Sequence, residues 1–399
     1  MIVINPPVIT AKDRFSILSS TIEIDGAEER LWYKFPQKFQ QYLVTENLDG
    51  FLVGLLFLGL RSGKDITLKA PVSARLLYTI NHYLIPALVL ANPKFHKINI
   101  LASGVNNKDL NAGKVAGTGM SCGIDSFASY YDHNNEVDSF GISYFTFFNV
   151  GSHLDFGGVK AREIYQNRLR SVSEFAKKEG KEVISVDSNL SEILKMNFQQ
   201  THSLRSISCV LQLQKLFKNY YYSSAYRFDH FKLNAEDTSD SDIFNLQMLS
   251  TESTNLFASA AQFSRVERTL MVAEHPGTYD KLDVCTAPML NGPYINCSIC
   301  YKCLRTQLTL ETGGKLHLYG NVFDIIKYKK YKDKYIGKLL LKKKKSPLDK
   351  EVIAFLKNEK IIFSLKAYYY AITSILNSPK KKIIISIKSL INNRPTLGK

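Results

Sequence analysis

"GTGMSCGIDSFASYY", residues 117–131, gathers Gly, Ser and Cys into one short cluster directly before a run of helix-forming residues. The residues ahead of it, Lys114-Val115-Ala116, have the character of a short β-strand. A strand that turns sharply into a helix presents the free N–H groups of the first helical turn, and such a terminus attracts anions. Two interpretations stay open from these residues alone: a loop that binds a phosphate, or an ordinary tight turn.

Strand-like and helix-like segments alternate after this cluster. Runs of aromatic and β-branched residues predict strands, and apolar residues at helical spacing predict helices. In chain order the predicted elements are 140–150, 158–180, 182–186, 203–218 and 220–225. This alternation is typical of an α/β fold with a doubly wound parallel sheet. Because ligands of such sheets collect at the carboxyl ends of the strands, residues 117–131 are expected to lie at a binding edge.

The two ends of the chain differ from this central part. Residues 1–110 mix short strand-like runs with apolar helical segments, which predicts an N-terminal α+β accessory region. Residues 111–319 would form the nucleotide-binding domain, and residues 320–399 would form a basic, mainly helical tail. From Asn321 onward 20 Lys and Arg accompany only 5 Asp and Glu, whereas the rest of the chain holds 32 and 31. The tail therefore carries 15 of the 16 net positive charges, which weakens any argument that the body is built to bind a polyanion.

Asp125 distinguishes the loop from a bare anion site. Ser121 and Ser126 can donate hydrogen bonds to phosphate oxygens, but a carboxylate repels them. Asp125 makes sense where Mg²⁺ bridges it to a nucleotide. The loop is not the P-loop of kinases and GTPases, because it contains no lysine and no Gly-Lys-Ser/Thr follows.

Four of the six cysteines fall within 19 residues, at Cys285, Cys297, Cys300 and Cys303. This C-x₁₁-C-x₂-C-x₂-C spacing supplies four soft ligands, which favours tetrahedral Zn²⁺ over four unrelated core cysteines. An iron–sulfur cluster is the rival interpretation, but ferredoxin-type spacing would place a further cysteine where the chain has Gln307. Zinc is preferred.

The loop sequence SCGIDS resembles the pyrophosphate loop, Ser-Gly-Gly-x-Asp-Ser, of the ATP pyrophosphatase (PP-loop) superfamily. It matches at Ser121, Gly123, Asp125 and Ser126, and departs at Cys122, where the family has Gly. The phrase NCSICYKCLRT, residues 296–306, resembles the metal loop of 7-cyano-7-deazaguanine synthase-like proteins, including uncharacterised members from bacterial polysaccharide gene clusters. The resemblance covers about residues 114–310 and extends to neither end of the chain.

The resemblance implies an ATP-dependent adenylating enzyme, a ligase-like or amidotransferase-like ATP pyrophosphatase that converts ATP to AMP and pyrophosphate. It would activate a carboxylate or amide oxygen of a small molecule or sugar for attack by a nitrogen or sulfur nucleophile. ATP, Mg²⁺ and Zn²⁺ would be the cofactors, with Asp125 and Ser126 as catalytic residues. The implied ATP-binding residues are Ser121, Cys122, Gly123, Ile124, Asp125, Ser126 and Gly151, and the implied metal ligands are the four clustered cysteines.

Two alternatives remain. One is a tRNA-modifying PP-loop enzyme, in which the basic tail would contact RNA. The other is a non-catalytic, zinc-stabilised nucleotide-binding protein, in which Cys122 marks a nucleotide site that no longer turns over. RNA binding that strengthens at low salt would favour the first, and nucleotide binding without turnover would favour the second.

Further polar residues are weaker candidates for nucleotide or substrate contacts. Ser152, His153, Asp187 and Asn189 follow predicted strands, where a simple turn is an equally good interpretation. The others are usually solvated charges, core residues or isolated histidines. They are Arg265, Glu267, Arg268, Lys302, Arg305, His202, His275 and Cys209.

The chain shows no expected membrane span, because its most apolar run, residues 51–60, is half the length that a spanning helix needs. With no recognisable signal peptide at its N-terminus, we expect a cytoplasmic protein. The expected partner is a small-molecule or sugar substrate, and a homo-oligomer stays open. The lysine-rich tail could contact RNA or an anionic membrane. A solvated helix is the simpler interpretation of the tail and is preferred.

Overall fold

The computed structural model describes residues 1–286, 292–342 and 346–376. The last 23 residues of the expected basic tail, 377–399, lie outside the described residues. Contacts divide the chain into two compact units: Met1–Ser121 with Asp125–Gln262, and Cys122–Ile124 with Phe263–Lys399. The expected boundaries at residues 110 and 320 each fall inside one of these units, and the expected division into three parts stays a prediction.

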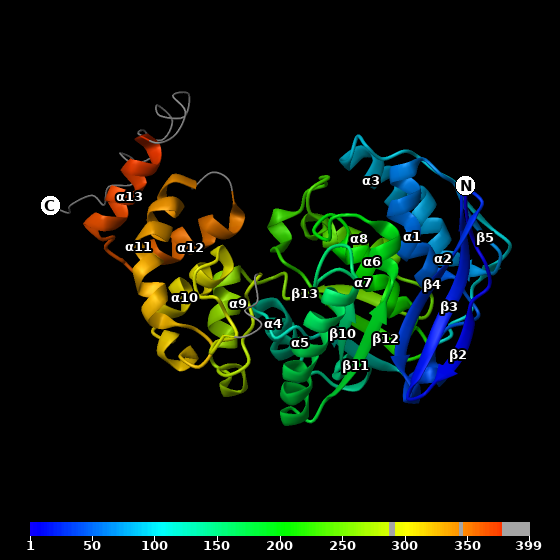
Figure 1. Cartoon of the computed structure of the whole chain (residues 1–399), viewed down its shortest axis with the longest axis horizontal. Coiled ribbons are helices and arrows are strands. Elements are labelled where there is room, and N and C mark those ends of the chain that lie inside the picture. Colours follow the sequence, from blue (N-terminus) through cyan, green and yellow to red (C-terminus); the bar gives the residue numbers. More distant parts are fainter. Residues whose placement is uncertain (287–291, 343–345, 377–399) are drawn as a thin grey trace. The chain divides into compact units, whose positions relative to one another are not determined.

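The first unit is built on one large, mainly parallel sheet, so the α/β class is confirmed (Figure 1). Five parallel strands follow one another in the spatial order β11-β10-β9-β12-β13. Their bounds are β9 Val115–Gly119, β10 Ile142–Asn149, β11 Glu182–Ser188, β12 Phe217–Ser223 and β13 Asn255–Ser259. The first of these strands in the sequence lies in the middle, and the chain extends the sheet on either side of it.

The N-terminal residues continue the same sheet beyond β11. Strand β4 pairs with β11 in antiparallel fashion, with Lys34 opposite Asp187, and β3 pairs with β4 along its whole length. Strands β1 and β2 both join β3, and β5 and β7 complete the edge. The bounds are β1 Ile2–Ile4, β2 Val8–Lys12, β3 Phe15–Ile24, β4 Ala27–Pro36, β5 Ile66–Leu68 and β7 Ile100–Ala102, while β6 Val72–Ser73 and β8 Val105–Asn106 form a separate pair.

Helices cover both faces of this sheet. Tyr33 and Trp32 are neighbours in β4, so their side chains point to opposite faces. The Tyr33 hydroxyl donates to Ser208 Oγ of α7 at 3.2 Å, whereas the Arg162 guanidinium of α5 lies 5.5 Å from the Trp32 ring centre. Helix α5 therefore lies on the face opposite α7. The helices of this unit are α1 Asp49–Ser62, α2 Ala74–Thr79, α3 Ile85–Ala91, α4 Ile124–Asp132, α5 Val159–Lys178, α6 Leu190–Leu194, α7 His202–Leu211 and α8 Asp242–Leu249.

The apolar run at residues 51–60 forms the middle of α1 and is buried throughout. It packs on α7 and on the sheet and forms a large part of the core. Within the described residues, no helix combines the length and the apolar character that crossing a membrane requires.

The second unit contains α9 Arg265–Val272, α10 Tyr301–Thr312, α11 Ile325–Lys342, α12 Pro347–Asn358 and α13 Leu365–Leu376 (Figure 1). Helix α11 begins the lysine-rich tail, but it is not a solvated helix: Tyr328 is fully buried, and Tyr335 is 2% exposed. Gly337 brings α11 close to α13, because a Cβ there would lie 2.7 Å from the Ala367 carbonyl oxygen. The preference for a solvated helix is therefore wrong for the inner face of α11, where tyrosines and leucines pack while the lysines stay outside.

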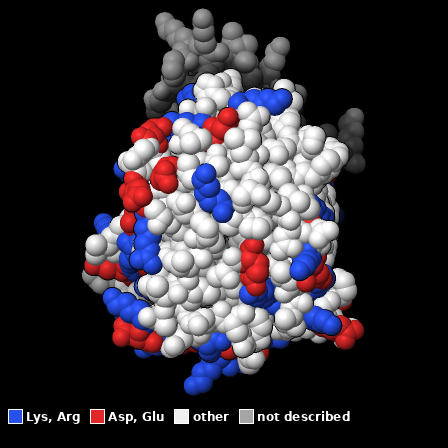
Figure 2. All heavy atoms as spheres, turned by 90° about the vertical axis from the view of Figure 1, so that its right-hand side faces the viewer, with Lys and Arg blue, Asp and Glu red and all other residues white. Residues whose placement is uncertain are grey.

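Figure 2 shows the side of the molecule that lies to the right in Figure 1. Lys and Arg are intermixed there with Asp and Glu around the margin, and the middle of the face carries few charged side chains. This distribution agrees with a neutral body, which offers no extended positive surface on this side to a polyanion.

Candidate nucleotide loop and cysteine cluster

The small-residue loop connects the carboxyl end of β9 to the first turn of α4. Its start is fixed to the neighbouring strand, because the Met120 N–H donates to the Thr146 carbonyl at 2.9 Å. The Ser121 N–H then donates to Ser126 Oγ at 3.2 Å, and the two serine hydroxyls lie 3.2 Å apart. Both serines and the N-terminus of α4 are thus held in one compact turn, with Asp125 in the first turn of the helix.

Cys122 adopts a left-handed backbone conformation with φ of +57°. Glycine adopts this conformation without strain, whereas a residue with a Cβ is strained there. Glycine would therefore suit this position. The Cys122 side chain is only 1% exposed, and burial raises the pKa of its thiol. Its carbonyl accepts a hydrogen bond from the Asp283 N–H at 2.8 Å. The thiol is therefore a neutral, packed group at physiological pH and not a reactive thiolate.

The left-handed backbone at Cys122 predicts different stabilities for two substitutions at this position. In Cys122→Gly, relief of strain offsets the lost burial, so the free energy of unfolding should stay within about 1 kcal/mol of the wild type. Cys122→Val should lower it by about 2 kcal/mol, because a β-branched side chain is poorly accommodated at positive φ. Urea denaturation of both variants measures the difference. A glycine variant less stable than the valine variant would contradict the assigned backbone conformation.

Gly151, which follows β10, also lies at positive φ, at +119°, and a Cβ there would collide with the Arg205 guanidinium. Arg205 is fully buried and donates to the carbonyl of Asp155 at 2.9 Å and to that of Met196 at 2.6 Å. Burial lowers its pKa to about 10, so it keeps its charge at neutral pH. A buried cation therefore fixes the loop in which Gly151 lies.

His153 lies in the same loop and is 5% exposed. Its Nδ1 is 3.0 Å from the Ser152 hydroxyl, and its ring packs edge-on against Phe147 and Tyr165. Burial, aided by the charge of Arg168, lowers the pKa of His153 to about 3. The imidazole is consequently neutral and packed in this structure.

Asp187 is the centre of a charged cluster at the carboxyl end of β11. Its carboxylate lies 3.3 Å from Lys34 Nζ and 3.2 Å from Arg162 Nε, and it accepts from Asn149 Nδ2 at 2.8 Å. Asn189 holds the backbone of β4 instead, through one accepted bond of 3.0 Å and one donated bond of 2.8 Å. Both residues thereby join β11 to the N-terminal strands.

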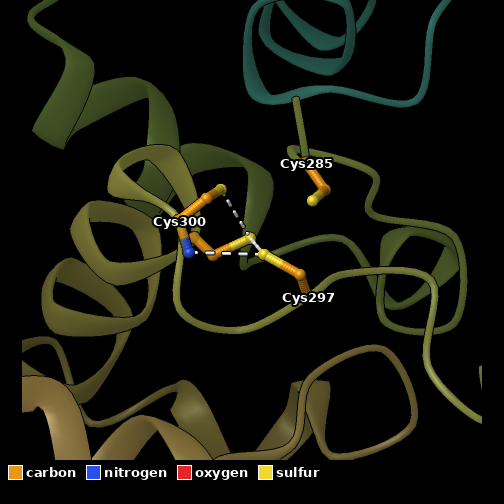
Figure 3. Close-up of side chains that lie close together, drawn as sticks. Cys285, Cys297 and Cys300 are labelled. Carbon is orange, nitrogen blue, oxygen red and sulfur yellow. Dashed lines mark hydrogen bonds between the residues drawn. The ribbon is translucent and has the colours of Figure 1, made fainter. Parts of the chain in front are cut away.

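The structure brings the four predicted metal ligands together. The sulfur atoms of Cys285, Cys297, Cys300 and Cys303 all lie within 4.8 Å of one another, and none of the four forms a disulfide. Figure 3 shows Cys285, which comes from one segment of the chain, lying close to Cys297 and Cys300, which share another. Cys300 Sγ is 3.3 Å and Cys297 Sγ 3.9 Å from Cys303 Sγ. Tetrahedral Zn–S bonds of about 2.3 Å require sulfur atoms about 3.8 Å apart, so the cluster could hold a metal ion such as zinc with little adjustment.

The local structure favours a thiolate at Cys300. Cys300 is the N-cap of α10, where the helix dipole stabilises negative charge, and its backbone N–H donates to Cys297 Sγ at 3.3 Å. Hydrogen bonds from the neighbouring thiols, that of Cys285 first, lower the pKa of Cys300. Contacts with the thiols of Cys285 and Cys300 raise the pKa of Cys303.

A buried amide holds the separate cysteine segments in place. Asn296 is 1% exposed; its Nδ2 donates to the Leu282 carbonyl at 2.7 Å and to the Val322 carbonyl at 3.2 Å. Its Oδ1 accepts from the Val284 N–H at 2.9 Å, next to Cys285. Ser298 Oγ accepts from the Asp324 N–H at 2.8 Å. Such outer contacts orient metal ligands, and here they connect the cysteines to the start of the tail.

The charged residues that open α9 have structural partners. Ser264 and Glu267 form a capping box, with bonds of 3.2 Å and 2.6 Å between side chain and backbone. Arg268 is fully buried, and its Nε donates to the Phe263 carbonyl at 3.1 Å. The Arg265 N–H donates to a Glu351 carboxylate oxygen of α12 at 2.7 Å. A solvated face is therefore the wrong description of Arg268.

The remaining candidates are spread through both units. Lys302 is exposed, while Arg305 is 5% exposed with its guanidinium carbon 5.5 Å from the Tyr301 ring centre. His275 is the N-cap of a single 3₁₀ turn, Pro276–Thr278. Cys209 is fully buried in α7, as expected for a core residue.

His202 belongs to a hydrogen-bonded network, which sequence reasoning left open. Its Nδ1 is 2.7 Å from the Tyr222 hydroxyl, and its Nε2 is 3.3 Å from Asp237 Oδ1. Burial alone would raise the pKa of Asp237, but hydrogen bonds from His202 and Ser239 outweigh it and lower the pKa to about 2. Asp237 therefore stays ionised opposite His202.

Three residues that organise these sites were not predicted: Arg205, Asp237 and Asn296. Each acts on partners that are distant in the sequence or contacts only backbone atoms, so no motif marks it. Asn296 alone had a signal, because it directly precedes the first cysteine of the C-x₂-C-x₂-C run. Comparison of the chain with protein-family models, with curated proteins and with solved structures finds no match.

Proposed function

We propose that the chain is an ATP-dependent adenylating enzyme of the PP-loop type, with a doubly wound nucleotide-binding sheet and a structural Zn²⁺. The observation that carries the proposal is the loop between β9 and α4, in which Ser121 and Ser126 meet at the N-terminus of a helix. The sheet supports the proposal as well, because its strand order changes direction between β9 and β12 and helices cover both of its faces. Ligands of such sheets bind at the point where the strand order changes direction. Sequence resemblance supplies the reaction class.

In the proposed reaction, a carboxylate or amide oxygen of the substrate attacks the α-phosphorus of ATP. The bond between that phosphorus and the bridging oxygen breaks, and pyrophosphate leaves with the electron pair. A nitrogen or sulfur nucleophile then displaces AMP from the activated substrate. Because no covalent step involves the protein, its contribution is to position the phosphates and to stabilise charge.

The loop residues have distinct parts in this proposal. The backbone N–H groups at the start of α4 and the hydroxyls of Ser121 and Ser126 would bind phosphate oxygens. Asp125, which is partly exposed in the first helical turn, would hold Mg²⁺, and the ion would neutralise charge on the phosphates. Cys122 contributes its backbone only, since its thiol is buried.

Zinc suits the cysteine cluster better than an oxygen-seeking cation, because the ligand set consists of four soft sulfur atoms. The set is complete with these four, as in closed structural sites, so we assign the ion a structural and not a catalytic part. Its effect would be to hold Cys285 against the start of α10.

The prediction that tests the nucleotide site concerns Asp125→Asn. The wild type should bind ATP at least tenfold more tightly with Mg²⁺ than in EDTA, and the variant should lose most of this difference because it loses the carboxylate ligand. Titration calorimetry with and without Mg²⁺ measures it. Glu163→Gln, an exposed change on α5, is the matched control and should behave as the wild type.

Turnover provides the second readout. With a small-molecule extract as the source of acceptor, AMP and pyrophosphate should appear together and disappear in Asp125→Asn. ADP and inorganic phosphate as the only products would overturn the proposal. Tight MgATP binding without any AMP would instead identify a non-catalytic nucleotide-binding protein.

A further inference from the structure

The outer face of the N-terminal hairpin carries a set of side chains that the proposed reaction does not use. In β4, Leu31, Tyr33 and Phe35 are fully buried. Because side chains alternate along a strand, Arg30, Trp32 and Lys34 project from the opposite face of the sheet. Two large cations and an aromatic ring therefore line one face of β4, while the other face of this strand packs on the core.

The partner strands complete a recess on this face. In the pairing of β3 with β4, Ile17 lies opposite Lys34, and Phe15 lies opposite Pro36. Lys12 of β2 lies opposite Phe15. The recess has a volume of about 600 Å³, which is typical of small-molecule sites. It is lined by Lys12, Asp13, Phe15, Ile17, Arg30, Trp32 and Lys34. All of its walls belong to the antiparallel strands β2, β3 and β4 of the sheet and to the turn between β2 and β3, which together are a rigid platform for a ligand.

The charges of the recess are only partly neutralised. Lys34 is paired with Asp187, but the guanidinium of Arg30 donates to the hydroxyl of Ser19, a neutral acceptor, at 2.7 Å and 3.0 Å. No ion pair of Arg30 or Lys12 occurs within the described part of the chain. Asp13 is the one carboxylate among the lining residues of this recess. Arg30 and Lys12 therefore leave an excess of positive charge facing the recess.

Trp32 is held in a defined orientation beside these cations. The Arg162 guanidinium carbon lies 5.5 Å from its ring centre, and Arg162 is itself fixed by Asp187 at 3.2 Å and by Glu192 at 2.7 Å. Lys34 Nζ lies 5.2 Å from the centre of the Phe15 ring. Indole and phenyl surfaces next to cations favour a ligand that combines a flat or apolar ring with a negative charge.

We propose that this recess binds a small anionic ring compound, with a six-membered ring against Trp32 and a carboxylate or phosphate at Arg30 and Lys12. The site is distinct from the loop between β9 and α4, and its occupation does not depend on the proposed adenylation. It lies beside the carboxyl end of β11, because Lys34 of its lining is opposite Asp187 in the register of β4 with β11.

Trp32 is the only tryptophan of the chain, so intrinsic tryptophan fluorescence reports directly on this recess. The full-length protein is titrated with glucuronate, glucose 6-phosphate, benzoate, glucose and acetate. The expected result is a saturable change with ring compounds that bear an anion and none with glucose or acetate. The two sugar derivatives distinguish carboxylate from phosphate, and benzoate distinguishes an aromatic ring from a sugar ring.

Substitutions then locate the anion. Arg30→Gln and Lys12→Gln should each weaken the binding of the best probe about tenfold, since each removes a charge-assisted contact. Lys97→Gln, an exposed change elsewhere in the first unit, should leave it unchanged. Urea denaturation confirms that the variants are folded. Equal responses to glucose and glucuronate, or unaltered binding in both recess variants, would overturn the proposal, whatever the outcome of the ATP experiments.

Discussion

Replacing Cys300 with serine is expected to abolish the proposed zinc binding and to unfold the part of the chain that begins at Phe263. Cys300 is both the N-cap of α10 and one of four sulfur atoms that lie within 4.8 Å of one another. Structural zinc contributes about 10–16 kcal/mol of binding free energy to small domains, as much as or more than the total stability of most domains. A hydroxyl is a poor substitute for a thiolate ligand, so most of that free energy should be lost.

Metal analysis and thermal denaturation measure the effect. The wild type should contain about one zinc ion per chain and be colourless, because d¹⁰ zinc has no visible transitions. Cys300→Ser should contain little or no zinc and melt at a much lower temperature or precipitate. Cys209→Ser is the matched control, since this cysteine is buried in α7 and outside the cluster. It should keep its zinc and lose only about 1–2 kcal/mol through burial of a hydroxyl.

Two outcomes would count against this assignment. A brown protein with iron and acid-labile sulfide would replace zinc with an iron–sulfur cluster. A metal-free wild type with an unchanged melting temperature in a strong chelator would remove the metal altogether.

Elements with clear boundaries were predictable from the sequence. The expected strand at 182–186 is observed as Glu182–Ser188, and the expected helix at 158–180 is observed as Val159–Lys178. In both cases the hydrophobic period continues to a polar or glycine boundary, so local residues decide the structure. The cysteine cluster was also predictable from local sequence, because three of its four ligands lie within seven consecutive residues, 297–303.

The N-terminal hairpin shows a signal that was present but not used. Strands β3 and β4 each have ten residues and meet at Asp25-Gly26, both at positive φ. Asp-Gly between alternating residues is a strong hairpin signal. The charged start of β4 obscured it, since its first four residues are exposed and look like a loop. That this hairpin extends the central sheet depends on contacts with Asp187 and Asn189, which no local pattern contains.

The expectation of a solvated helix in the C-terminal segment followed its lysine-rich composition and not the helical spacing of its apolar residues. Lysines dominate α11, yet Tyr328, Tyr335 and Leu339 recur on one face at helical spacing and are buried. Burial raises the pKa of Tyr328, whose hydroxyl donates to a Glu311 carboxylate oxygen of α10 at 2.6 Å. Long lysine side chains can project from the rim of such a helix and leave its inner face apolar.

Truncation after Gly320 is therefore expected to destroy the second unit rather than trim it. It removes Val322 and Asp324, whose backbone groups bond to Asn296 and Ser298 on either side of Cys297. It also removes α11, whose side chains Tyr328 and Leu339 are buried. Loss of several large buried side chains, at about 2–4 kcal/mol each, exceeds what a single domain tolerates.

A shorter truncation separates this effect from a peripheral one. Ending the chain after Leu376 removes six Lys and Arg but keeps α11, α12 and α13. This form should retain its zinc and its melting temperature, whereas the form that ends at Gly320 should be insoluble or metal-free. The form that ends at Leu376 also tests whether the removed charges contact a polyanion. Its sedimentation with anionic liposomes and its binding to bulk tRNA at two salt concentrations are measured for this purpose. A Gly320 form that stays soluble and zinc-loaded would show that the contacts of α11 add little to the second unit, and the tail would then be peripheral despite its buried tyrosines.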